Sequence, residues 1–92
     1  MRLSEETAVQ KAKEDLSKRL GVSLSDVRTV SVAKTDFPDM SLGAAASGEI
    51  SAQMIATGWI IRLAVAGKGY EYRADKSHLR LVGFDGRNYV IS

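Results

Sequence analysis

Residues 58–75, GWIIRLAVAGKGYEYRAD, decide the fold. Up to residue 65 the chain alternates, so that one face of an extended segment carries four large apolar side chains: Trp59, Ile61, Leu63 and Val65. After Gly67-Lys68-Gly69, apolar side chains again take every second position, at Tyr70, Tyr72 and Ala74. A period of two on both sides of a glycine-rich turn predicts an antiparallel hairpin with one apolar face.

Further strands are predicted on both sides of this hairpin. Upstream, Val30 and Val32 alternate with small residues near 28–35, and a second strand is expected near 49–56. The apolar face expected for this second strand consists of Ile50, Ala52, Met54 and Ala56. Downstream, a strand begins at Leu79, Asp85-Gly86 is a two-residue turn signal, and residues 89–91 form the last strand. The segments together predict an antiparallel meander of five to six strands.

Residues 5–20 predict an amphipathic helix. Ser4 is a suitable cap at its start, and Gly21 is a suitable stop. Its apolar stripe consists of Ala8, Ala12, Leu16 and Leu20. Because this stripe needs an apolar surface to cover, and the sheet offers one, we predict an α+β fold in which the N-terminal helix packs on the meander. A chain of 92 residues makes one such domain, residues 1–92.

Composition narrows the function classes. The net charge of +2 is too small to indicate a nucleic-acid partner, and we read Arg62, Arg73, Arg80 and Arg87 as a solvated face of the sheet. The absence of cysteine excludes disulfides, thiol catalysis and thiolate metal sites. No run of about 18 apolar residues occurs, so neither a membrane span nor a signal segment is expected, and the compartment stays open.

Catalytic residues are scarce. His78 is the single histidine, and it lies in an expected turn beside Ser77, too local a pair to form an aimed nucleophile and base. The carboxylate pairs Asp36/Asp39 and Glu71/Asp75 are expected to be exposed, and spacing alone does not shift a pKa. We therefore expect no enzyme activity.

Cofactor and metal signals are equally weak. Gly67-Lys68-Gly69 is followed by a strand, whereas a phosphate-binding loop needs a helix N-terminus at that point. Asp36, Asp39 and Glu49 would bind a metal only if the chain between them folded back on itself. No cofactor and no metal are expected.

The longest expected connection is Asp36 to Gly48, 13 residues against the usual 4–6. Phe37 and Leu42 are its apolar anchors, Pro38 restricts the backbone, and Asp39 and Ser41 are suited to hold a turn. Residues 44–48 have only small side chains and are expected to form a flexible segment that leads back to the sheet. The segment is either a structural crossover that plugs the end of the core or a recognition loop.

Several short motifs carry a resemblance to a family. They are Leu20-Gly21-Val22, Val30-Ser31-Val32, the stretch Phe37-Pro38-Asp39-Met40-Ser41-Leu42-Gly43, Thr57-Gly58-Trp59-Ile60-Ile61-Arg62-Leu63 and Gly69-Tyr70-Glu71-Tyr72-Arg73. In this order they resemble a group of small uncharacterised prokaryotic domains, often found in exported proteins, with a Trp-Pro-Asp-x-Ser-Leu-Gly-Cys-Pro loop. Phe37 stands here for the Trp, Ala44-Ala45 for Cys-Pro, and Arg73 for a usual His.

The layout is also distantly similar to the PepSY group of secreted domains. That resemblance implies an exported or envelope location and a part in restraining proteases. It implies no established activity.

Our leading hypothesis is a non-enzymatic binding module for a protein partner. Its expected partner-binding residues are Phe37, Pro38, Asp39, Ser41, Leu42, Gly43, Trp59 and Tyr72. Alanine at Asp39 and Leu42 should then weaken partner capture and leave the fold intact. The rival hypotheses are a small-ligand pocket or active site between helix and sheet, using Asp39, Tyr72 or His78, and a structural appendage of a larger exported protein. An exposed edge strand would also allow a homodimer.

Overall fold

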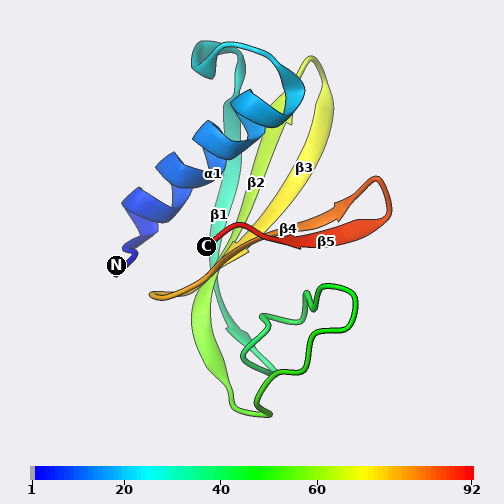
Figure 1. Cartoon of the computed structure of the whole chain (residues 1–92). Coiled ribbons are helices and arrows are strands. Elements are labelled where there is room, and N and C mark those ends of the chain that lie inside the picture. The colour runs from blue at the N-terminus through cyan, green and yellow to red at the C-terminus, as the bar shows by residue number, and fades with distance from the viewer. Residues whose placement is uncertain (1) are drawn as a thin grey trace.

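One helix packs across one face of a five-stranded antiparallel sheet (Figure 1). The computed structural model describes residues 2–92. The elements are α1 (Glu5–Leu20), a short 3₁₀ helix (Leu24–Asp26), β1 (Arg28–Phe37), β2 (Ala56–Val65), β3 (Lys68–Ala74), β4 (Leu79–Phe84) and β5 (Arg87–Val90). The strands lie in the order β1-β2-β3-β4-β5, each antiparallel to its neighbour. The predicted α+β meander is confirmed.

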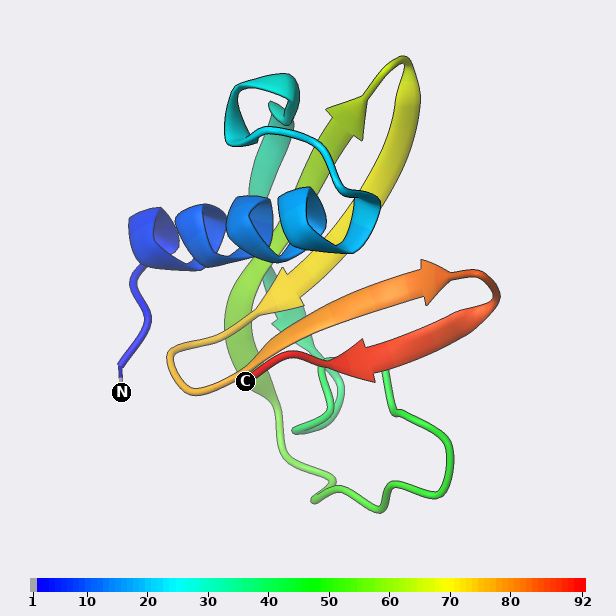
Figure 2. The same cartoon turned by 45° about the horizontal axis from the view of Figure 1, so that its top comes forward.

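The helix begins and ends where its sequence indicates. Ser4 Oγ accepts a hydrogen bond from the Thr7 amide, and Thr7 Oγ1 accepts one from the Ser4 amide, so two donors at the helix start are satisfied. Gly21 ends the helix in the left-handed conformation, at φ 68°. Figure 2 shows α1 crossing the sheet obliquely, with the β4–β5 hairpin below it.

The main core lies between α1 and the sheet. Ala8, Ala12 and Leu16 are fully buried, and small alanines let the helix backbone approach the strands closely. The sheet contributes the apolar face predicted from residues 58–75. From β2 and β3 it consists of Ile61, Leu63, Val65, Tyr72 and Ala74, and β4 adds Leu79 and Leu81. Burial of this surface is the dominant favourable term in the fold.

A polar bond ties the helix to the sheet inside this layer. The Tyr72 hydroxyl, on β3, donates to Asp15 Oδ2 at 2.6 Å, and Asp15 also pairs with Arg19 one turn later. Burial raises the pKa of Tyr72, and the bond to Asp15 raises it further, so the phenol stays protonated and remains a donor. This arrangement gives the fully buried Tyr72 a partner for its hydroxyl.

The predicted strand near 49–56 is wrong. β2 begins only at Ala56, where the predicted strand was expected to end, and runs straight through Thr57-Gly58. β1 is already paired with β2 from Arg28↔Ala64 to Phe37↔Ala56, so residues 49–55 have no neighbouring strand to join. The connection between β1 and β2 is therefore 18 residues long, Pro38 to Ile55, and not 13.

The turn of the β2–β3 hairpin begins one residue earlier than predicted. Ala66 and Gly67 form the turn, both with positive φ (50° and 79°), and Lys68 and Gly69 already belong to β3. Two central residues with φ above zero match the twist of the flanking strands. Asp85-Gly86 forms the predicted second turn in the same way, with φ 51° and 77°.

Candidate functional site

The long connection Pro38–Ile55, which we call the β1–β2 loop, lies against the face of the sheet that α1 leaves open. In Figure 1 it is the green segment that swings beneath β4 and β5 before returning to β2. Its length is well beyond a usual connection, and long loops that keep a defined shape are commonly functional. The site is built from this loop and from the strand side chains that hold it.

A second, smaller core anchors the loop at its start. Phe37, Leu42 and Ala56 are buried together, and Met40 and Ile60 pack against them. Leu42 is fully buried although its φ is 63°, a conformation that a leucine rarely adopts. The two anchors predicted from the sequence, Phe37 and Leu42, are confirmed.

Asp39 shapes the turn between these anchors. One carboxylate oxygen, Oδ1, accepts hydrogen bonds from the Ser41 amide (2.9 Å), the Ser41 hydroxyl (2.5 Å) and the Gly43 amide (3.2 Å). The Ser41 hydroxyl, followed by the Gly43 amide, lowers the pKa of Asp39. The turn predicted for Asp39 and Ser41 is confirmed, and Ser41 is buried as part of it.

Side chains from three strands then fasten the loop to the sheet. Arg73 Nη1 on β3 donates to the carbonyl oxygens of Leu42 (3.0 Å) and Gly43 (3.3 Å). Arg80 on β4 donates to the Ala44 carbonyl and, with both terminal nitrogens, to the Glu49 carboxylate. Asn88 on β5 donates to the Ala45 carbonyl at 3.1 Å. The flexible segment predicted for 44–48 is thus held at several points.

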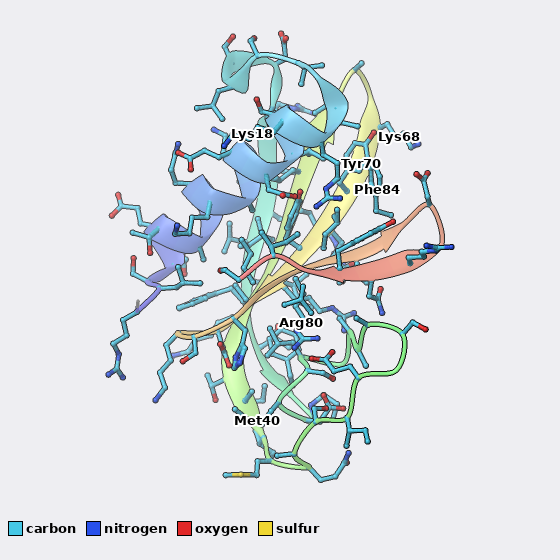
Figure 3. All side chains as sticks on the ribbon, viewed as in Figure 1. Lys18, Met40, Lys68, Tyr70, Arg80 and Phe84 are labelled. Atoms are coloured by element: carbon cyan, nitrogen blue, oxygen red, sulfur yellow. The ribbon has the colours of Figure 1, made fainter. Side chains whose placement is uncertain are left out.

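Arg80 overturns the expectation of a solvated arginine face. Its side chain is 4% exposed and lies between β4 and the loop, as Figure 3 shows. A buried guanidinium needs a paired anion, and Glu49 supplies it in bidentate geometry, Nη2 to Oε2 being 2.6 Å. Arg80 therefore fixes the position of residues 44–49, because its buried charge must be paired with an anion and its N–H groups must be hydrogen-bonded.

The Glu49–Arg80 pair makes the loop sensitive to acid. The Arg80 hydrogen bonds, helped by the Ala46 amide, lower the pKa of Glu49 from 4.5 to about 2. Because the folded-state pKa is the lower one, the contribution of Glu49 to stability is present above pH 4.5 and is lost as the pH falls toward 2. We expect the amides of residues 44–49 to lose hydrogen-exchange protection over that interval, before the amides of β2 and β3.

The matched variant Glu49→Gln should remove most of this pH dependence. The backbone amides of the loop would then show low protection at neutral pH as well, because the neutral glutamine side chain cannot balance the buried Arg80 charge. Unchanged protection of 44–49 in the variant would mean that Arg80 does not hold the loop.

Beyond Glu49 the loop turns its side chains outward. Ile50 is 97% exposed, Ile55 74% and Met54 63%. Isolated exposed apolar residues are normal, but three of them within six consecutive positions form a feature that needs an explanation. Sequence reasoning missed this segment because the alternation of Ile50, Ala52 and Met54 resembles a strand; the signal is there, but it marks exposed apolar residues and not a buried face.

The structure separates the residues that we predicted as one partner-binding set. Phe37, Ser41, Leu42 and Tyr72 are buried, while Pro38 and Gly43 are exposed and Asp39 and Trp59 half-buried. Trp59 and Tyr72 pack in the main core under α1, on the opposite face of the sheet from the loop. The loop and the aromatic hairpin therefore do not share one surface.

The residues of the rival pocket are also apart. Tyr72 is covered by α1 and bonded to Asp15, and His78 lies in the turn after β3. Asp75, which we expected to be exposed, is buried: its Oδ1 accepts from the amides of Ser77 (2.8 Å) and His78 (2.7 Å) and lies 3.0 Å from His78 Nδ1. This bonding gives Asp75 and His78 a structural role in the turn.

Within residues 2–92, no group of three or more acidic, histidine or cysteine side chains is placed to hold a metal ion. In the same part of the chain, α1 and the 3₁₀ helix are too short and too polar to cross a membrane.

The fold and the fastened loop define a small α+β domain. Residues 9–82 match the model of a family described as a domain of unknown function (DUF8738). The chain belongs to this family. The matched range runs from the second turn of α1 into β4 and includes the whole β1–β2 loop. Neither the curated proteins nor the solved structures include a match.

Proposed function

We propose that this domain is a non-enzymatic module that binds a protein partner through the outward side of the β1–β2 loop. The observation that carries the proposal is the contrast within the loop. Its inner side is fixed by Leu42, Arg73 and Arg80. Ile50, Met54 and Ile55 project to solvent from a segment whose Ala52 carbonyl accepts a hydrogen bond from the Met40 amide at 3.0 Å. Anchors that are already ordered lose little conformational entropy on binding.

The proposed contact surface lies further along the loop than residues 37–43, whose main role is then to support it. Phe37, Ser41 and Leu42 support the loop from inside, and exposed Pro38 and Gly43 lie at its border. A few large apolar side chains commonly supply most of the binding energy of an interface. The partner that fits is therefore a protein with an apolar groove, able to cover Met54 and Ile55.

Site-specific photo-crosslinking tests this proposal in cells of the organism that encodes the domain. A photoreactive phenylalanine at Met54 should give one discrete crosslinked species, and the same group at Leu24, which is exposed outside the loop, should not. Serine at Ile50 and Ile55 should reduce the yield at Met54 roughly tenfold.

The matched control changes three exposed apolar residues outside the loop, as the variant L24S/V30T/V90T. The crosslinked species should persist in it. Equal crosslinking from positions 24 and 54, or a yield that is insensitive to the Ile50 and Ile55 changes, would contradict a loop-specific partner.

A second copy of this chain is the other candidate partner. β1 is an edge strand of ten residues, most of them exposed, and such an edge can pair with another strand. Sedimentation over a wide concentration range tests it, since a monomer at all concentrations removes the homodimer. An envelope location and a restraining action on a protease follow from the PepSY-like resemblance alone; the crosslinked partner's identity tests both.

A further inference from the structure

A V-shaped cleft opens where β3 and β4 separate, between Gly69 and Tyr70 on one side and Gly83 and Phe84 on the other. The two strands pair only from Glu71↔Val82 to Ala74↔Leu79. Beyond that point β3 continues to Lys68 and β4 to Phe84 without pairing to each other. Figures 1 and 2 show the β4–β5 hairpin swinging away from β3.

Gly83 causes the divergence. Its φ is 67°, a left-handed conformation, and the β4–β5 register is irregular between Leu81 and Phe84 at this residue. Its amide donates to Asn88 Oδ1 at 3.0 Å, so it is turned toward β5. A bulge of this kind bends a strand and ends its pairing. The resulting cleft has a volume of about 420 Å³, within the range of small-ligand sites.

The floor of the cleft is aromatic. Tyr70 and Phe84 line it, with ring centres 6.1 Å apart, and Leu63 lies beside them. Figure 3 shows Lys68, Tyr70 and Phe84 gathered at this opening. The rings belong to the edge of the main core and are reached through the gap between the strands. The floor therefore suits one large apolar or aromatic side chain.

The β3 wall offers backbone hydrogen bonds. Lys68 and Val65 flank the two-residue turn and pair with each other, so alternate residues of β3 direct their backbone groups away from β2. Gly69 is one of them, and the ladder with β4 stops at Glu71 before reaching it. Gly69 lines the cleft, and a Cβ added to it would meet nothing within 4 Å, so the space beside this residue is open.

The same wall carries an excess of positive charge. Glu71 is held between Arg62 (3.5 Å) and Arg73 (2.8 Å), and Lys68 adds a third cation whose ammonium lies 5.6 Å from the centre of the Tyr70 ring. Within residues 2–92 no carboxylate pairs with Lys68. Asp85, the other acid of the cleft, lies on the opposite lip at the β4–β5 turn. An anionic group is therefore favoured beside Lys68.

We propose that this cleft binds an N-acylated amino acid that has a free α-carboxylate and a large apolar side chain. The carboxylate would pair with Lys68, the amide would hydrogen-bond Gly69, and the side chain would cover Tyr70 and Phe84. A protein or peptide C-terminus and a free N-acyl amino acid share this chemistry. The site is separate from the residues 50–55 proposed to bind a protein partner.

Titration of the ¹⁵N-labelled protein with N-acetyl-phenylalanine tests the site. The amides of Gly69, Tyr70, Gly83 and Phe84 should shift in a saturable way, and N-acetyl-phenylalaninamide, which lacks the charge, should bind roughly tenfold more weakly. The variant Lys68→Gln should lose a similar factor, whereas Lys76→Gln, in the exposed turn after β3, should bind as the wild type does.

A hexapeptide ending in phenylalanine distinguishes the two sources. Tighter binding than N-acetyl-phenylalanine assigns the site to a chain terminus, and weaker binding assigns it to the free acid; either result supports the shared chemistry. The proposal is overturned if these amides do not shift at millimolar probe, if the uncharged amide binds equally well, or if Lys68→Gln has no effect.

Discussion

Gly58→Ala should be among the most destabilising single substitutions in this domain. A Cβ at position 58 would lie 1.9 Å from the Ala74 carbonyl oxygen and 2.9 Å from both the Ala74 carbonyl carbon and Asp75 Cα. All three atoms are backbone, so no flexible side chain can move aside. Relief requires β2 and β3 to separate at Trp59↔Ala74, where the pairing of the two strands ends.

The expected cost is at the upper end of overpacking effects, about 3 kcal/mol or more. A domain of this size has a total stability of roughly 5–14 kcal/mol, so this change removes a large part of it. We expect the Tm to fall by at least about 10 °C in thermal unfolding followed by circular dichroism. The separation also disturbs Asp75, whose carboxylate holds the next turn.

Gly69→Ala is the matched control. Gly69 also lies in a strand, but a Cβ there meets nothing within 4 Å, and its φ is not positive. The control should change the Tm little or raise it slightly, since alanine has less freedom in the unfolded chain. If Gly58→Ala cost no more than Gly69→Ala, the close approach of β2 to the end of β3 would be refuted.

Local sequence patterns predicted the elements whose caps, hydrogen bonds and turns are formed by residues close together in the sequence. The helix from Glu5 to Leu20 follows from its cap, its stripe and its stop, and the hairpin around Ala66-Gly67 follows from alternation and a turn. Gly58 shows where the same reasoning fails. In the sequence it resembles a break between strands, but it lies inside β2. A glycine is needed at this position because the backbone of Ala74 and Asp75 leaves no room for a Cβ.

The candidate site was predictable only in part, for a related reason. Phe37, Leu42, Asp39 and Ser41 bond and pack within a few residues, and their anchoring roles were visible. The pairing of Glu49 with Arg80 spans 31 residues, and no local pattern announces it. Without that pair, nothing in residues 44–55 distinguishes a strand from a fastened loop with exposed isoleucines.

Leu42→Ala is the second substitution with a large expected effect, and it decides what residues 37–43 do. Leu42 is fully buried against Phe37 and Ala56, so truncation leaves a cavity in a cluster of few members. Such changes cost about 2–5 kcal/mol. We therefore expect a clear drop in Tm, in contrast to our sequence-based expectation that alanine at this position leaves the fold intact.

The matched control is Leu24→Ala, at a leucine that is 39% exposed, where the cost should be about 0.5 kcal/mol or less. Backbone ¹⁵N heteronuclear NOE values separate a local from a global effect. In Leu42→Ala these NOE values should fall across residues 38–49 and stay high in β2 and β3. The Arg73 hydrogen bond to the carbonyl of residue 42 remains, because alanine keeps this carbonyl, but that bond does not replace the lost packing.

Crosslinking from Met54 in the Leu42→Ala variant distinguishes a supporting role of Leu42 from a direct contact. If the anchors act only by holding the loop, Leu42→Ala should weaken crosslinking from Met54 in proportion to the loop's lost order, and partner binding should recover as temperature is lowered and the loop reorders. A variant that keeps wild-type NOE values and Tm but loses the crosslink would instead make Leu42 a direct contact, which its burial in the free domain contradicts.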